Sequence, residues 1–145
     1  MKKAIYAVLI AVCAGIILSV CGSKVENPSG MTAEETVQRF FSYWNEKSDK
    51  GMDSLEYEKL PKGGRELYYV NSLEVNSCIE RKNYNKEDWN EPWFSSPYDV
   101  ACVDTNFTID VKEGSALTSG TYGYTFYLVK ESKDADWMIV MYGQG

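Results

Sequence analysis

Large apolar side chains near residue 40 follow a helical spacing. Four of them recur at positions i, i+3, i+4 and i+7: Val37, Phe40, Phe41 and Trp44. This spacing places them on one stripe of an α-helix, and burying each contributes roughly 1.5 to 3 kcal/mol, so we expect the stripe to organise the core. Thr32 and Glu35 have the spacing of a capping box, which predicts that the helix begins at Thr32.

A second, shorter helix is expected after the first. The first helix is expected to fade over residues 45–49, and Gly51 is expected to stop or break it because glycine is a poor helix former. A short helical segment is then predicted over residues 53–60. Residues 61–64, with the sequence Pro-Lys-Gly-Gly, close that segment.

From residue 67 onward the spacing of apolar residues changes from helical to alternating. β-branched and aromatic residues gather in runs bounded by turn residues, which is typical of strands. Four strands are predicted, over residues 67–80, 98–112, 121–131 and 137–142. Residues 132–136 have the composition of a hairpin loop between the last two strands, which favours an antiparallel sheet.

Strict alternation assigns the side chains of the first two strands to two faces of the sheet. It places Leu73, Val75 and Ile79 on the apolar face of the first strand and Cys78 on the polar face. On the second strand Cys102 falls on the polar face, and the apolar face carries five residues: Ala101, Val103, Phe107, Ile109 and Val111. Each of these strands is therefore predicted to have one face in water.

The N-terminus has the pattern of a bacterial export signal. Lys2 and Lys3 precede an uncharged apolar run over residues 4–20, which ends at Cys21. Residues 18–23, Leu-Ser-Val-Cys-Gly-Ser, resemble the lipobox of bacterial lipoproteins, in which the cysteine is acylated and becomes the mature N-terminus. The resemblance implies a leader over residues 1–20 and a lipid at Cys21 that anchors the protein to the extracytoplasmic face of the cell membrane. An uncleaved membrane-spanning helix and secretion with release are the alternatives.

A tether and one domain follow the predicted anchor. Residues 21–31 have no periodicity and contain Asn27, Pro28, Ser29 and Gly30, which predicts a flexible tether. The chain has 145 residues, a length that fits a single domain over residues 32–145.

Composition narrows the classes of function. The chain has 15 basic and 21 acidic residues and a formal charge of -6, which argues against binding of nucleic acid. It contains no histidine, which excludes imidazole catalysis and histidine-ligated metals. We therefore expect neither a metal nor a cofactor.

The order of the predicted elements resembles a known superfamily. Three segments are similar to uncharacterised lipoproteins of Gram-positive bacteria that carry a nuclear transport factor 2-like domain: residues 40–45 followed by Leu55, residues 124–131 and residues 136–139. The resemblance implies an α+β fold in which N-terminal helices pack on a curved antiparallel β-sheet and form a cone with a pocket at its open end. Some members of the superfamily are enzymes, and many only bind or dimerise.

Two cysteines remain when the leader and the acylated Cys21 are set aside, namely Cys78 and Cys102. Alternation puts both on the polar side of what are candidates for neighbouring strands. We therefore expect a cross-strand disulfide, with two free thiols as the alternative.

The connection over residues 81–97 is rich in aromatic residues, and a loop of this length usually has a task. Its rings either plug the wide end of the cone or line a ligand pocket. The candidate pocket residues all carry an aromatic ring: Trp44, Trp89, Trp93, Phe94, Tyr124 and Phe126. We predict a membrane-anchored domain that binds or scaffolds without catalysing, with a small molecule, a glycan or a peptide as the class of ligand.

The competing hypothesis is an enzyme similar to the ketosteroid isomerases, which pair an Asp base with a Tyr donor in an apolar cavity. The candidate groups lie on the last three strands: Asp99, Asp104, Asp110, Tyr122, Tyr124, Tyr127 and Tyr142. Asp104 and Asp110 share a face with polar residues, so we favour the binding function. The enzyme hypothesis uses an Asp or Glu base with a Tyr donor, and it predicts a carboxylate in the pocket within hydrogen-bond reach of a tyrosine hydroxyl.

Overall fold

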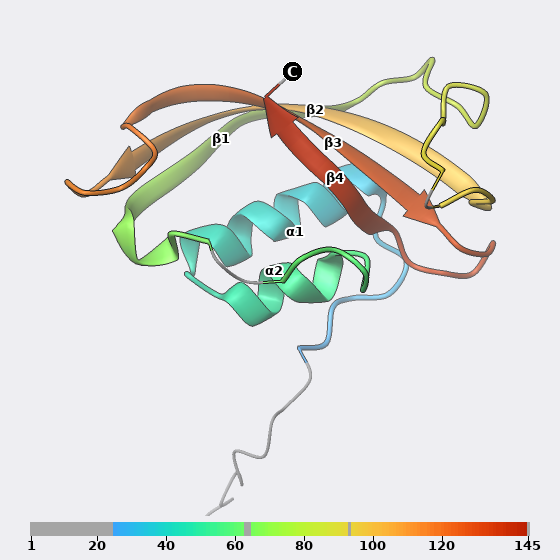
Figure 1. Cartoon of the computed structure of the whole chain (residues 1–145), viewed down its shortest axis with the longest axis horizontal. Coiled ribbons are helices and arrows are strands. Elements are labelled where there is room, and N and C mark those ends of the chain that lie inside the picture. Colours follow the sequence, from blue (N-terminus) through green and yellow to red (C-terminus); the bar gives the residue numbers. More distant parts are fainter. Residues whose placement is uncertain (1–24, 63–64, 93, 145) are drawn as a thin grey trace, which may run out of the picture.

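Two helices cover the concave side of a curved sheet in the computed structural model of the chain (Figure 1). The structure describes residues 25–62, 65–92 and 94–144. The helical elements come first: α1 (Ala33–Asn45), α2 (Asp49–Leu55) and a 3-10 turn (Leu67–Tyr69). The strands follow: β1 (Val70–Glu80), β2 (Asp99–Val111), β3 (Gly120–Lys130) and β4 (Met138–Gln144). The predicted α+β class, with N-terminal helices on an antiparallel sheet, is confirmed.

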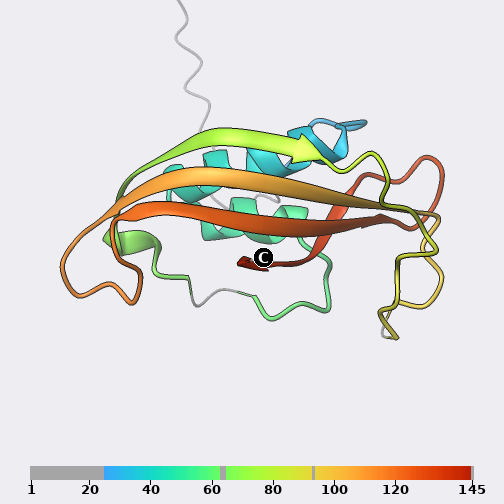
Figure 2. The same cartoon turned by 90° about the horizontal axis from the view of Figure 1, so that it is seen from above.

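The sheet is a simple meander. Each strand pairs with the next one in the chain, in the order β1-β2-β3-β4, and all three pairings are antiparallel. Figure 2 shows β1, β2 and β3 running side by side above the helices. Such connections between sequential neighbours are short and local, which agrees with strands that were predicted from turn residues between apolar runs.

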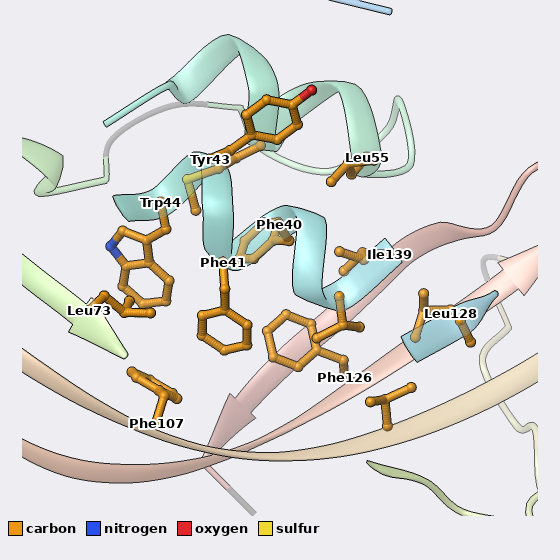
Figure 3. Close-up of a cluster of buried hydrophobic side chains, with 14 of the residues drawn as sticks. Phe40, Phe41, Tyr43, Trp44, Leu55, Leu73, Phe107, Phe126, Leu128 and Ile139 are labelled. Atoms are coloured by element: carbon orange, nitrogen blue, oxygen red, sulfur yellow. The ribbon is translucent and has the colours of Figure 1, made fainter. Parts of the chain in front are cut away.

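Helix α1 forms the centre of the core, as its spacing predicts. The Thr32 Oγ1 accepts a hydrogen bond from the Glu35 amide at 3.1 Å, and the Glu35 carboxylate accepts one from the Thr32 amide at 2.7 Å, which completes the capping box. The apolar stripe meets aromatic residues of the sheet (Figure 3). Phe41 lies 4.9 Å from Phe107, ring centre to ring centre, in a fully buried aromatic cluster.

The second helix begins earlier than predicted, and the prediction that Gly51 breaks the helical segment is wrong. Lys47, with a φ of 58°, marks the break after α1, and the Ser48 hydroxyl caps α2 by accepting a hydrogen bond from the Gly51 amide. Gly51 lies buried within α2, where a Cβ would overlap the ring of Tyr43. Glycine therefore allows the two helices to approach closely.

Strict alternation fails in the second half of β1. The register against β2 shifts between Val75 and Ser77, and such an irregularity turns the following residues over. Cys78 therefore packs against the core, whereas Ile79 is 62% exposed. The predicted faces of these two residues are wrong for this reason.

The outer face of the sheet is not uniformly in water, contrary to the prediction. At the end of the sheet near the β3–β4 turn, Val100, Val129 and Val140 are buried in a second, smaller cluster. Aromatic side chains from the β1–β2 connection pack against this cluster: Tyr84, Trp89 and Phe94. This connection is the loop at the upper right of Figure 1.

Residues 25–31, the described part of the predicted tether, make specific contacts with the domain. Tyr43 donates a hydrogen bond from its hydroxyl to Asn27 Oδ1 at 2.8 Å, and the Asn27 amide nitrogen donates to the Ser54 hydroxyl at 2.8 Å. The Gly30 amide donates to Asp136 Oδ1 at 2.9 Å. The segment is thus joined to α1, to α2 and to the turn between β3 and β4.

The predicted leader over residues 1–20 and the predicted anchor, Cys21, lie outside the described residues. Across residues 25–62, 65–92 and 94–144, no helix is both long enough and apolar enough to cross a bilayer.

Side chains of α1 occupy part of the free edge of β1. The Leu73 amide donates to Asn45 Oδ1 at 3.2 Å, and the Glu80 amide donates to Glu34 Oε1 at 2.7 Å. Two backbone donors of the edge strand are therefore satisfied by the helix, one near each end of the strand.

Candidate functional site

An apolar pocket of about 240 Å³ opens beside the C-terminal end of α1. Trp44 contributes to its wall from the helix, and Tyr124 and Tyr142 contribute from β3 and β4. Val70 and Val111 line it from the first residue of β1 and the last residue of β2. The pocket therefore lies where the helical layer and the concave face of the sheet part from each other.

The aromatic part of the wall is continuous with the core. The ring of Trp44 lies 5.7 Å from that of Phe107 and 6.5 Å from that of Tyr124, and the Tyr124 ring lies 6.4 Å from that of Tyr142. Burial raises the pKa of both tyrosines above the ordinary value. Both hydroxyls are thus protonated at neutral pH, and that of Tyr124 can donate a hydrogen bond to a ligand.

Arg65 forms the polar part of the wall. Its guanidinium lies 2.9 Å from Asp49 Oδ1, 2.7 Å from Asp53 Oδ1 and 2.6 Å from Glu56 Oε2. Asp49 and Asp53 are one helical turn apart on α2, so their carboxylates reach the same cation. The Arg65 and Glu56 side chains are 11% and 2% exposed, so this pair is shielded from water, whereas Asp53 and Asp49 are 28% and 45% exposed.

The charges of this cluster are matched to one another. Burial opposes the charged form of Arg65, but hydrogen bonds to the three carboxylates outweigh burial and raise its pKa. Lys62 Nζ lies 3.7 Å from the Glu56 carboxylate, and the Tyr142 hydroxyl interacts with both Arg65 and Glu56. Arg65 is therefore already paired with three carboxylates and is poorly placed to bind an anionic ligand.

Glu66 fixes the rim of the pocket on the side of the β2–β3 loop. Its carboxylate accepts a hydrogen bond from the Ser115 hydroxyl at 2.9 Å and another from the Ala116 amide at 2.7 Å. All three residues line the pocket. The Glu66 carboxylate is thus engaged in holding the loop.

The structure brings two of the predicted pocket residues together. Trp44 and Tyr124 both line the pocket. Phe126 does not reach it, because its ring is fully buried between the helix and the sheet, 5.5 Å from that of Phe40 and 5.1 Å from that of Tyr142 (Figure 3).

The aromatic residues of the β1–β2 connection lie elsewhere. Trp89 and Phe94 pack on the outer face of the sheet, where the Trp89 Nε1 donates to the Phe94 carbonyl at 2.8 Å. Trp93 lies outside the described residues. Neither Trp89 nor Phe94 lines the apolar pocket beside Trp44 or lies over it.

Cys78 and Cys102 are free thiols. The predicted disulfide between them is therefore wrong. Cys78 pairs with Thr105, three residues along β2 from Cys102, a separation of about 10 Å at the usual rise of a strand. The register shift in β1 also turns Cys78 towards the core, while Cys102 stays on the opposite face. A disulfide requires Cα atoms within about 7 Å, which this arrangement does not provide.

None of the carboxylates named by the enzyme hypothesis lines the pocket. Asp104 lies on the outer face, where hydrogen bonds from Arg81 lower its pKa. Asp110 accepts hydrogen bonds from Asn71 and Ser119. Asp99 is exposed at the start of β2. These three carboxylates are therefore surface groups.

A carboxylate does lie next to a tyrosine hydroxyl, but it is a different one. Glu56 interacts with Tyr142. Tyr142 is one of the candidate tyrosines of the enzyme hypothesis, whereas Glu56 is not one of its candidate carboxylates. Glu56 does not line the apolar pocket, and its charge is balanced by Arg65 and Lys62. A general base needs to contact the ligand's proton, and Glu56 is not placed for that.

The spacing of carboxylates along the chain indicates this cluster. The second helix was predicted to begin at residue 53, which left Asp49 outside it. Three carboxylates recur at i, i+4 and i+7 from residue 49: Asp49, Asp53 and Glu56. Once α2 is known to begin at Asp49, the first two share a helix face, and a nearby cation is expected to neutralise them. In the structure this cation is Arg65, which directly follows the turn over residues 61–64.

No group of three or more Cys, Asp or Glu side chains in the described ranges is arranged to hold a metal ion.

Comparison with known proteins identifies the family. No curated protein and no solved structure matches the chain. A family model described as a domain of unknown function (DUF4829) matches residues 34–143, which include both helices and all four strands almost completely. The chain therefore belongs to the DUF4829 family.

Proposed function

We propose that the protein is a membrane-anchored, extracytoplasmic lipoprotein whose domain has the nuclear transport factor 2-like cone and binds a small, neutral, mainly apolar ligand without catalysing. The curved sheet around α1, with a pocket where the two part, supports the cone. The arrangement of basic residues, apolar run and Cys21 supports the anchor.

The pocket wall is the observation that carries the ligand class. Aromatic and aliphatic side chains such as Trp44, Tyr124 and Leu117 make up most of it. The charged groups beside it are already paired, Arg65 with three carboxylates and Glu66 with the β2–β3 loop. A charged ligand would lose its hydration and find no free partner, whereas an apolar one gains free energy from burial.

The size of the pocket limits the ligand. A volume of about 240 Å³ lies below the roughly 300 to 1,000 Å³ that is typical of sites for drug-sized molecules. The hydroxyl of Tyr124 provides a donor for one acceptor on the ligand, whereas that of Tyr142 interacts with Arg65 and Glu56. The chemistry expected of the ligand is therefore that of a small hydrophobic molecule, with a ring or short alkyl chain and few polar atoms.

Binding is testable with an uncharged fluorescent naphthalene, N-phenyl-1-naphthylamine. We expect its emission to rise and shift to shorter wavelength with the purified domain, and Leu117→Trp, which fills the pocket, to weaken binding by about tenfold or more. Glu74→Trp, on the exposed outer face, is the matched control and should leave the affinity unchanged. Equal binding by the Leu117 variant would contradict the proposal, as would equally tight binding of a naphthalene sulfonate.

The anchor is tested separately by cell fractionation. Cys21→Ala should move the protein from the membrane fraction to the soluble extracytoplasmic fraction, because its only proposed lipid attachment is removed. A variant that remains equally membrane-bound would show that acylation at Cys21 does not hold the protein there.

A further inference from the structure

We propose that the helical layer of the domain faces the membrane at close range and that the outer face of the sheet points away from it. This inference rests on the proposed anchor at Cys21. It concerns the orientation of the domain, which neither the leader pattern nor the pocket specifies.

The first observation is that the chain is attached to the domain already at residue 25. Val25 packs against the main core cluster, and Asn27 joins Tyr43 of α1 to Ser54 of α2 through two hydrogen bonds of 2.8 Å. The Tyr43 side chain that holds Asn27 is itself buried. The segment is therefore seated on the helical layer and does not act as a long free tether.

The second observation is the short length of chain left between the anchor and this contact. Cys21 and Val25 are separated by four Cα–Cα steps, which span at most about 14 Å when fully extended. A lipid at Cys21 would keep that residue at the membrane surface. Val25, and with it the surface around it, then lies within about 14 Å of the headgroups.

The position of the segment decides which face this is. In Figure 1, residues 25–31 lead into the N-terminal end of α1 and lie along the helices on the side away from the sheet. In the opposite orientation the outer face of the sheet would lie at the membrane. The four Cα–Cα steps between Cys21 and Val25 would then have to span the helical layer, in which each helix is about 10 Å across, and the sheet as well. The available chain is too short for that.

The charge of the helical surface is compatible with a layer of phospholipid headgroups. Basic and acidic side chains are mixed on it, with Arg39, Lys47 and Lys50 among Glu35 and Glu46. The Arg39 guanidinium stacks on the Tyr43 ring at 4.2 Å and forms no ion pair within the described ranges. Its buried Nε has no hydrogen-bond partner there, and Arg39 lines an open groove with residues 28–31. The groove, which Glu35 also lines, thus holds a guanidinium with no ion-pair partner in the described ranges, a group that pairs with lipid phosphates.

The orientation is testable by accessibility of single cysteines in the full chain, expressed with its leader and kept in native membranes. Ser42→Cys places a thiol in the groove beside residues 28–31, and Glu74→Cys places one on the outer face of β1. Both are exposed positions. Cys78 and Cys102 are partly and fully buried, and burial raises both thiol pKa values, that of Cys78 to about 11, so their background labelling is low and is subtracted with the parent chain.

Each labelling rate in membranes is divided by the rate of the same variant in detergent. After this normalisation, we expect a polymer-linked maleimide to label the Ser42 variant about fivefold more slowly than the Glu74 variant. An insertion of 20 Gly and Ser residues between Lys24 and Val25, about 25 Å in average reach, should abolish the difference. Equal normalised rates without the insertion would overturn the orientation.

The outcome for the anchor is read independently. If Cys21→Ala releases the protein while the two cysteines label equally, only the orientation is wrong. If Cys21→Ala leaves the protein on the membrane, the proposed anchor fails and the orientation is overturned with it.

Discussion

The two faces of the sheet bury apolar surface in different ways. The concave face packs on α1 through a continuous cluster of aromatic rings, and residues far apart in the chain such as Phe41 and Phe126 meet there, 5.5 Å apart. The outer face buries only one end of the sheet, under a loop that joins neighbouring strands. The concave face therefore holds the helices and the sheet together, whereas the outer cluster holds one loop on a sheet that is already formed.

The same difference applies to charge. Arg65 and Glu56, on the concave side, are 11% and 2% exposed, whereas Arg81 and Asp104 on the outer face are 48% and 45% exposed. Water solvates an exposed pair whether or not it forms, so such pairs contribute little, while a shielded charge depends on its partner. The comparison leads to four predictions, from the largest effect to the smallest.

Removing a ring from the concave face should cost most. Phe126→Ala leaves a cavity in a fully buried cluster and is expected to lower the free energy of unfolding by about 3 to 5 kcal/mol. Trp89→Ala on the outer face should cost about half of that or less, because Trp89 is only partly buried. Urea unfolding measures both changes. Equal costs would mean that the loop cluster is part of the main folding unit.

Removing the shielded arginine should rank second. Arg65→Met leaves the Glu56 carboxylate, 2% exposed, with Lys62 as its remaining cation, and we expect a loss of about 3 kcal/mol. Arg81→Met is the matched variant on the outer face and should cost about 0.5 kcal/mol. Thermal unfolding of both variants at low and high salt checks the ranking, and salt should matter more for the Arg81 variant. A small effect of Arg65→Met would contradict the contrast.

The third prediction concerns the close contact between α1 and α2 at Gly51. Gly51→Ala introduces a methyl group where the Tyr43 ring lies, so we expect a loss of about 1 to 3 kcal/mol. Gly143→Ala, where nothing lies within 4 Å, should be nearly neutral. The penalty at Gly51 should shrink when Tyr43 is replaced by Leu, which a double-mutant cycle measures. Additive effects would show that the ring is not the cause.

The smallest effect concerns pH. Arg81 lowers the pKa of Asp104, so the pair adds stability above the pKa of the unfolded chain, and this contribution is lost as the pH falls through the lower folded value. Asp104→Asn should therefore cost about 0.5 kcal/mol at pH 7 and less at pH 3, because the contribution of the pair falls as the pH is lowered. Unfolding curves at the two pH values measure this difference, and a cost that did not change with pH would exclude the ion pair as its source.

Local patterns predicted most of the fold. The capping box at Thr32 and Glu35 gave the start of α1, and alternation placed the second strand over residues 98–112 where β2 spans Asp99–Val111. These features depend on residues a few positions apart. The α+β class followed from them, because helices with one apolar stripe must cover a sheet with one apolar face.

Features that depend on distant residues were not predictable in this way. The role of Gly51 depends on the ring of Tyr43, and the faces of Cys78 and Ile79 depend on one register shift in the pairing with β2. Of the pocket, the sequence indicated Trp44 and Tyr124 by their aromatic character. It did not indicate Arg65, because the carboxylates that define its position lie 9 to 16 residues earlier in the chain.

The way α1 covers the edge of β1 has a consequence for chains held close together. An exposed edge strand is a template on which another polypeptide can extend the sheet, and repeated extension leads to fibres. An incoming strand would first have to displace Asn45 from the Leu73 amide and Glu34 from the Glu80 amide. The helix that builds the interior thus also hinders extension of the sheet at the edge of β1.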